Sequence, residues 1–362
     1  MFGKRERSCT DTTEEKCFLS YGVAMGVNPV FFKSKFLAII LAGVFLLSAC
    51  SGESSSSTSS SNCVGLVCIE TVDVANAGNP ADADTGFGAV SDPYAIGKYE
   101  VKVGQYVVFL NAVATTTDQD AIRDLWSPDM QNLKSYVSAV GLITRTGLGT
   151  STQPYVYTEM VDPSLGANSG ERAILNISWF SAARFANWLH NGATASASTE
   201  TGAYTLNYAT SGVFTKNADA RWWIPSEDQW YKAAYYDPTK AGSNKYWKYP
   251  TRSDAAPVAE AFPGGSNSAN YDSSPALEGK RITPVGVYAG SVSYYGTYDQ
   301  AGLMWEWNDA VYTDYDSKPI TRGMRGGSWS LGMINVSKFS PRDYEPSYDD
   351  DDSGFRLATT RK

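Results

Sequence analysis

Apolar residues recur at the period of an α-helix in three stretches of the chain. Over residues 103–114, the side chains of Tyr106, Phe109, Leu110 and Val113 fall on one helical face. The stretch therefore predicts an amphipathic helix whose apolar face packs against a core.

Serines mark the starts of two further predicted helices. Ser178 is a candidate N-cap for a second helix, in which Trp179, Ala183, Ala186 and Leu189 would face the core. Ser226 is a candidate N-cap for the third, with Gln229 three residues later in the position of a capping box. Buried positions of the third helix would include Trp230, Ala233 and Ala234.

Other stretches follow the period of a strand or no period at all. Residues 94–101 alternate and predict a strand, and residues 222–224 are also typical of one. Residues 115–170 are more polar, and we expect loops there with a short helix near residues 119–126. Residues 323–358 follow neither period, and long irregular segments in a compact domain are usually functional or disordered.

The N-terminus is typical of an exported lipoprotein. Residues 36–47 are apolar and follow Lys33 and Lys35, a length and flank that suit a signal peptide. Residues 47–50, Leu-Ser-Ala-Cys, match the lipobox of bacterial lipoproteins, so Cys50 is the predicted lipidation site and residues 1–49 the signal. An ordinary secretory signal or a short membrane anchor is the alternative, and Met25 is a candidate for the true start.

We expect residues 50–90 to form a serine-rich tether and lead-in, followed by a single domain over residues 91–362. In an oxidising compartment Cys63 and Cys68 would form a small disulfide loop; a metal pair is the less favoured interpretation. The expected location is the outer membrane and cell surface of a bacterium, with a lipid anchor on Cys50.

Composition and charge narrow the class of function. Hydrophobic residues make up 43% of the chain, with 10 Trp, 23 Tyr and 32 Gly, which favours a compact, loop-rich fold with a large core. The net charge is −8, and without residues 1–49 it is −10, so a nucleic-acid partner is not expected. No glycine-rich phosphate loop follows a predicted strand.

Five motifs in order resemble the formylglycine-generating enzyme (sulfatase-modifying factor) domain family, over roughly residues 92–358. They are residues 177–189, 223–230, 295–307, 325–329 and 354–356. The resemblance implies an α+β fold, a variant of the C-type lectin fold, with two main helices around a small antiparallel sheet and much irregular structure.

The family's catalytic residues are missing from this chain. Its enzymes use two cysteines that bind copper, and the matching positions here are about Leu331 and Val336, while the last cysteine of the chain is Cys68. The single histidine, His190, cannot build the iron site of a related branch, and we interpret it as structural. We therefore expect no enzyme activity and no catalytic residue.

A calcium site is a weaker candidate. Asn270 and Glu306 match calcium ligands of the family, but Leu303 replaces an oxygen ligand, so we expect no cofactor and keep calcium as an alternative. Glu306 would otherwise be a buried carboxylate that hydrogen-bonds to backbone. Four adjacent carboxylates at residues 349–352 also invite calcium, but a solvated, self-repelling loop is the favoured interpretation for at least some of them.

The segment of about residues 325–358 resembles the variable region of proteins diversified by retroelements. That resemblance implies a hypervariable ligand-binding surface on a monomer, with an unidentified protein or glycan as the ligand. The expected contact residues are Ser330, Leu331, Gly332, Ile334, Val336, Phe339, Asp343, Tyr344, Tyr348, Asp349, Asp350 and Asp351.

In such systems asparagine codons are mutagenised at their adenines, and these codons cannot yield Lys, Met or Glu. Lys338, Met333 and Glu345 would accordingly be fixed or derive from other codons. The alternatives are a static envelope lipoprotein and a divergent enzyme of the family.

Overall fold

The computed structural model describes residues 59–117, 124–135, 138, 140–162, 167–272, 281–313 and 321–361. The predicted signal peptide, Met25 and Cys50 lie outside these residues, as does most of the short helix expected near residues 119–126. In the part of the chain that is described, no helix is long and apolar enough to cross a membrane.

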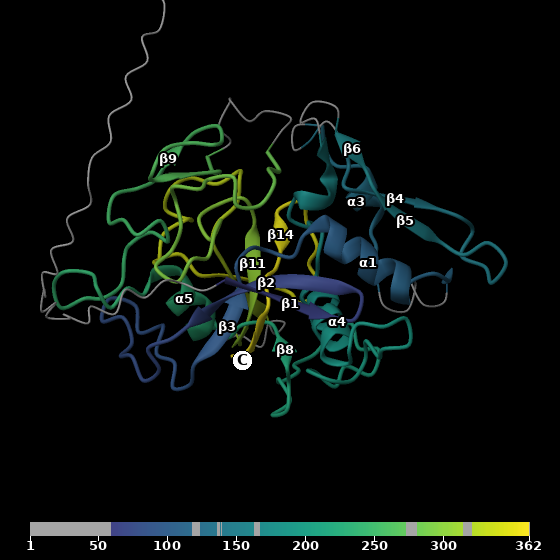
Figure 1. Cartoon of the computed structure of the whole chain (residues 1–362), viewed down its shortest axis with the longest axis horizontal. Coiled ribbons are helices and arrows are strands. Elements are labelled where there is room, and N and C mark those ends of the chain that lie inside the picture. Colours follow the sequence, from purple (N-terminus) through teal and green to yellow (C-terminus); the bar gives the residue numbers. More distant parts are fainter. Residues whose placement is uncertain are drawn as a thin grey trace, which may run out of the picture. The chain divides into compact units, whose positions relative to one another are not determined.

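A five-stranded antiparallel sheet joins the two ends of the domain. Its order is β1 (Ser59–Val64), β2 (Val67–Val74), β3 (Tyr94–Gly97), β15 (Ala358–Thr360) and β8 (Trp222–Trp223). The C-terminal strand β15 thus lies between β3 and β8, so the end of the chain is an interior strand of this sheet (Figure 1).

The β1–β2 hairpin corrects the expected domain boundary. The expected tether and lead-in include residues 59–74, but β2 pairs with β3 from Thr71 to Val74, and its side chains Val67, Ile69, Val72 and Val74 belong to the core. Cys63 and Cys68 face each other across the hairpin and form the expected disulfide. The folded domain therefore begins well before Ser91.

The three main helices begin close to where the sequence predicts them. They are α1 (Val103–Val113), α4 (Trp179–His190) and α5 (Glu227–Tyr235), with a short α3 (Pro128–Gln131) and a 3₁₀ turn at Ser169–Glu171. Ser178 Oγ accepts a hydrogen bond from the backbone N–H of Ser181 at 3.1 Å. Ser226 and Gln229 form the predicted capping box of α5.

A four-stranded sheet carries both ends of the irregular C-terminal segment. Its order is β13 (Arg342–Tyr344), β12 (Thr321–Arg325), β11 (Trp305–Tyr312) and β14 (Ser353–Gly354), and β14 pairs with β11 in parallel. Short two-stranded sheets lie within the loop regions. They pair β4 (Ile143–Thr146) with β5 (Val156–Glu159), β6 (Val161–Asp162) with β7 (Ala167–Asn168), and β9 (Val258–Ala259) with β10 (Ser268–Ala269).

Aromatic side chains fill the core between these elements. Five tryptophans are almost fully buried: Trp179, Trp188, Trp230, Trp305 and Trp307. Every residue of α4 is buried, so this helix is enclosed on all sides rather than amphipathic at a surface. The long irregular stretches after α5 (green) and after β12 (yellow) lie side by side over this core (Figure 1).

Candidate functional site

The irregular segment is held at its start by a buried arginine and two glycines. The Arg325 side chain is fully buried and pairs with Glu227 at the start of α5. Gly326 and Gly327 have φ values of 105° and 76°, which only glycine adopts without strain. A Cβ on Gly327 would also come within 2.9 Å of Val336 Cγ1, so the backbone passes too close for any side chain.

Arg356 holds the other end. Its Nε lies 2.5 Å and its Nη2 2.7 Å from the two oxygens of Glu306, and Nη2 lies 3.2 Å from Glu100. All three side chains are fully buried. Burial lowers the pKa of Arg356, but the charges of Glu306 and Glu100 outweigh it and raise the pKa overall. Arg356 therefore stays charged and fixes the end of the segment to the core.

The same network occupies both carboxylate oxygens of Glu306, one of the candidate calcium ligands. Its Oε2 also accepts a hydrogen bond from Trp230 Nε1 at 2.8 Å, so both oxygens face donors from protein side chains. The expected backbone hydrogen bonds are replaced by an arginine and a tryptophan. Asn270 directs its Nδ2 to Arg281 O at 2.5 Å, and its own carbonyl accepts the N–H of Leu303. These residues do not fit a calcium ion, which needs several free oxygens.

No group of three or more His, Cys, Asp or Glu side chains in the described residues has the geometry of a metal site. His190 is a buried residue at the end of α4, and its Nδ1 accepts the N–H of Arg221 at 3.1 Å. Burial, and then the charge of Arg221, lowers its pKa. The contact fits the structural role predicted for His190.

Between its two ends the segment displays large apolar side chains. Ile334 is 69% exposed, Met333 59% and Phe339 50%, whereas Ser330, Leu331 and Gly332 are half-buried. Met333 is therefore as accessible as the predicted contact residues. Val336 is not: it is fully buried in a cluster with Tyr249, Ala269, Tyr271 and Ala301, so its place among the predicted contacts is corrected.

A stack of polar aromatic side chains follows. The rings of Tyr344 and Tyr348 lie 4.1 Å apart at an interplanar angle of 24°, and the guanidinium of Arg342 lies 4.1 Å from the Tyr344 ring. Asp343 beside them is exposed. Stacked rings that are partly exposed offer a large contact area and lose little conformational entropy on binding. Arg342 was not among the predicted contacts, and its spacing in the sequence gave no signal for it.

The acidic run after Tyr348 is only partly solvated. Asp349 is exposed; partial burial, and then the nearby charges of Asp124 and Asp129, raises its pKa to about 6. Lys134 Nζ lies 3.6 Å from Asp350 and 2.9 Å from Asp351.

Asp351 and Asp352 are buried, which corrects the prediction of Asp351 as a surface contact. They close the loop rather than point to solvent: the backbone carbonyl of Asp352 accepts the N–H of Trp305 at 2.8 Å, and that of Asp351 accepts Trp329 Nε1 at 3.4 Å.

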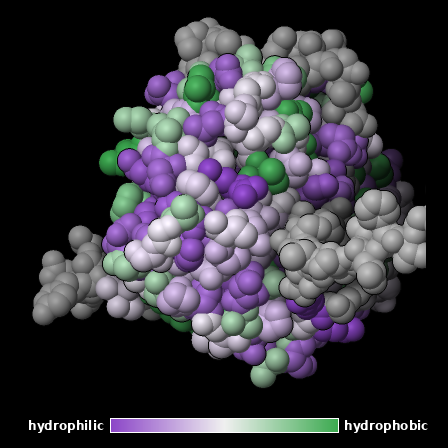
Figure 2. Space-filling model, turned by 60° about the vertical axis from the view of Figure 1, so that its left-hand side comes forward, coloured by the Kyte–Doolittle hydropathy of each residue, from purple (hydrophilic) through white to green (hydrophobic). Residues whose placement is uncertain are grey.

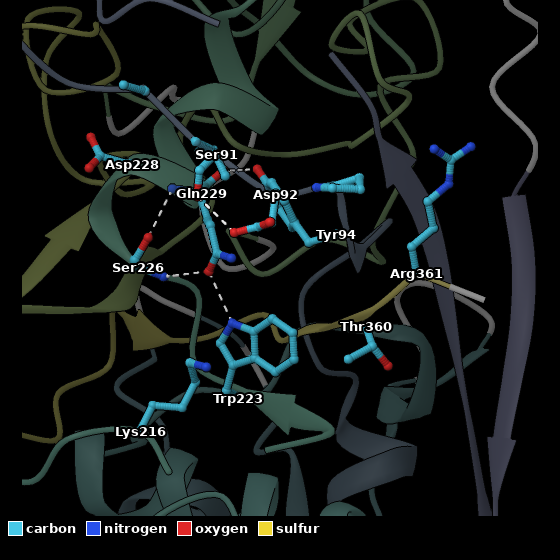
Figure 3. A pocket seen from close by; sticks show the side chains of 13 residues that line it. Ser91, Asp92, Tyr94, Lys216, Trp223, Ser226, Asp228, Gln229, Thr360 and Arg361 are labelled. Carbon is cyan, nitrogen blue, oxygen red and sulfur yellow. Dashed lines mark hydrogen bonds between the residues drawn. The ribbon is translucent and has the colours of Figure 1, made fainter. Parts of the chain in front are cut away.

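A hollow of about 550 Å³ lies at the start of α5, apart from the irregular segment (Figure 3). Gln229 organises it: its Oε1 accepts hydrogen bonds from Trp223 Nε1 and Ser226 N, both at 3.0 Å, and its carbonyl accepts the hydroxyl of Tyr94. These polar groups satisfy each other, so we interpret this part of the hollow as the cap of the helix.

Comparisons with known proteins agree on the fold. The model of the sulfatase-modifying factor enzyme 1-like domain matches residues 70–361. Treponema denticola variable protein 1 has a similar structure, with a TM-score of 0.52 and 17% identity, over 84% of this chain and 99% of that one. No curated protein matches the chain by sequence.

Two further solved structures match with TM-scores below 0.5. CarF has a TM-score of 0.46 and 18% identity over 81% of this chain and 99% of its own. PvdO from Pseudomonas aeruginosa has a TM-score of 0.47 and 15% identity over 84% of this chain and 98% of its own.

Proposed function

The chain belongs to the sulfatase-modifying factor enzyme 1-like family, and we propose that it is a non-catalytic binding protein that contacts its ligand through residues 330–350. The observation that carries the proposal is the contrast within the segment. Both ends are fixed by buried ion pairs, while Met333, Ile334 and Phe339 between them are at least half exposed. Exposed apolar groups on a rigid frame are typical of binding surfaces.

The absence of catalysis is inferred from the side chains at the matching positions. Leu331 and Val336 stand where the family's enzymes have cysteines, and neither can bind a metal or form a thiolate. Val336 also belongs to an apolar cluster and reaches no solvent. Copper or iron found in stoichiometric amount in the purified protein would contradict this part of the proposal.

The segment's variability is a further part of the proposal. Its mixed, partly apolar surface suits one sampled sequence among many, and one structure that shares the fold is named a variable protein. We expect the DNA beside the gene to contain a near-identical repeat of the segment that differs at adenines, next to a reverse transcriptase. A flanking region without such a repeat would leave a static binding lipoprotein as the better hypothesis.

Display on a lipid anchor would place this surface outside the cell. The lipobox at residues 47–50 supports the anchor. Mass spectrometry of the N-terminal peptide of the purified protein should find Cys50 lipidated, and Cys50→Ser should abolish this modification. An N-terminal peptide that begins at Cys50 without lipid would contradict the anchor.

The binding role is tested by exchanging the segment on a constant frame. The protein and a version with a different 330–350 sequence, each with Val336, Ser337 and Lys338 retained, should be applied to the same protein and glycan arrays. We expect each version to bind a different set of spots. Identical sets from two correctly folded versions would show that the ligand contacts another surface.

A further inference from the structure

The segment contains one short stretch that is buried although both its flanks are accessible. Val336, Ser337 and Lys338 are buried, and we call them the anchor. Residues 330–335 before it, the first loop, and residues 339–345 after it, the start of the second loop, are half-buried or exposed. A single flexible loop would not return to the core in its middle.

Lys338 is the residue that makes the anchor unusual. Its side chain is 3% exposed, and Nζ lies 2.7 Å from Asp82 Oδ2 and 2.7 Å from Asp84 Oδ2. Asp82 is itself buried and accepts a hydrogen bond from the hydroxyl of Tyr231 at 2.7 Å. Burial raises the pKa of Asp82, but the hydrogen bonds from Lys338 and Tyr231 outweigh it and lower the pKa overall. The charged pair is thus built into the core.

The backbone of Lys338 is held as firmly as its side chain. Its N–H donates to Lys248 O at 3.0 Å, and its carbonyl accepts Arg325 Nη1 at 2.9 Å. Arg325 is the arginine that opens the segment and pairs with Glu227 of α5. Lys338 therefore connects the stretch before β3, the stretch after α5 and the start of the segment itself.

We propose that Lys338 is a positioning residue that divides the binding surface into two separately supported loops. The first loop presents Met333 and Ile334, and the second begins with Phe339 and presents Asp343 and the Arg342–Tyr344–Tyr348 stack. Each loop returns to a fixed point at both ends, so the sequence of one can change without displacing the other. The role of this division in binding rests on the proposed function. Its effect on the structure can be measured without a ligand.

The division also assigns different constraints to residues within the segment. An uncharged or acidic side chain at position 338 would leave Asp82 buried without its cation, and a buried unpaired charge is strongly destabilising. Met333 and Glu345 are exposed and carry no such constraint. Of the three residues that asparagine codons cannot yield, the structure gives a reason for a constant residue only at Lys338.

Hydrogen exchange of the purified full chain, measured without ligand, tests the anchor. In Lys338→Met we expect exchange at residues 330–345 to become at least about tenfold faster, which corresponds to a loss of about 1.4 kcal/mol in local stability. Lys248→Met is the matched control, because Lys248 is exposed and contributes its backbone carbonyl. Lys338→Arg should restore much of the protection. Equal exchange in K338M and K248M would overturn the proposal.

Two milder variants decide the outcome if K338M does not fold. Asp84→Asn removes one of the two partners of Lys338 at a side chain that is half exposed, and it should speed exchange in both loops while β11 is unchanged. Ile334→Asp alters the tip of the first loop and should leave exchange of the second loop as in the wild type. Unchanged exchange in D84N, or a second loop that responds to I334D, would refute separate support. The two proposals fail separately. Identical array results would contradict binding by the segment and leave the exchange results unaffected, whereas unchanged exchange would contradict separate support and leave the array results unaffected.

Discussion

Lys232 in α5 is a buried cation, and no carboxylate in the part of the chain that the structure describes forms an ion pair with it. Its Nζ donates to the carbonyl of Asn76 at 2.9 Å and lies 5.9 Å from the Tyr236 ring. Burial lowers its pKa to about 8, compared with 10.5 for an exposed lysine. The folded state therefore disfavours the charged form that the unfolded chain carries at neutral pH.

Lys232→Met should for this reason stabilise the protein at pH 7, because it removes a buried charge at the loss of one hydrogen bond worth about 1 kcal/mol. Between pH 8 and 10.5 the unfolded wild type binds more protons at this site than the folded one, so wild-type stability rises relative to the variant. Urea unfolding at pH 7 and pH 10 measures both effects. The difference between the two proteins should shrink or reverse at pH 10; a constant difference would contradict the lowered pKa.

At the scale of elements, the sequence predicts the helices well because their signals are local. The apolar period places α1 within one residue, and serine N-caps place the starts of α4 and α5. The β1 strand has no such signal: Ser59, Ser60 and Ser61 resemble a tether and become a strand because Val67–Val74 pairs with them. The structure of residues 59–61 is therefore decided by their pairing with β2 and not by their own sequence pattern.

The sequence predicts the place of the irregular segment but not which of its residues are buried. Its two ends carry recognisable motifs, and its lack of periodicity marks the irregular stretch between them. The burial of Val336 and Lys338 depends on residues far away in the chain, such as Tyr249 and Asp82, and no local pattern encodes it. A lysine in the middle of a predicted surface loop would ordinarily be taken as solvated.

The capping box of α5 provides a test at the same scale. Ser226 Oγ accepts the N–H of Gln229 at 3.2 Å, and Gln229 Oε1 accepts the N–H of Ser226 at 3.0 Å. Ser226→Ala should lower the free energy of unfolding by about 1 kcal/mol, because it leaves a backbone donor of the first turn without its partner. Ser91→Ala is a suitable control, since Ser91 is exposed and lies near the same helix start. Urea unfolding that shows no difference between the two variants would contradict the role of the cap.

The whole molecule depends on residues that precede its most recognisable motifs. Strand β2 pairs with β3 over four residues. The backbone oxygen of Asn76 accepts a hydrogen bond from Lys232 Nζ, and Asp82 forms an ion pair with Lys338. Without residues 59–90, two buried lysines would lose their partners, and the five-stranded sheet would lose two strands. Breaking one buried ion pair costs about 3–5 kcal/mol, which is a large part of the roughly 5–15 kcal/mol that stabilises a typical domain.

Three chains with different starts separate these contributions. A chain beginning at Ser59 should unfold at the same temperature as one beginning at Cys50, because it retains the contacts of residues 59–361. A chain beginning at Ala75 lacks the hairpin but keeps Asn76 and Asp82, and it should melt at a lower temperature in a cooperative transition. A chain beginning at Ser91 should show no cooperative transition in calorimetry. Cooperative melting of this last chain near the wild-type temperature would restore the boundary that the sequence suggests, and would mean that neither Lys338 nor Lys232 needs its partner for the fold.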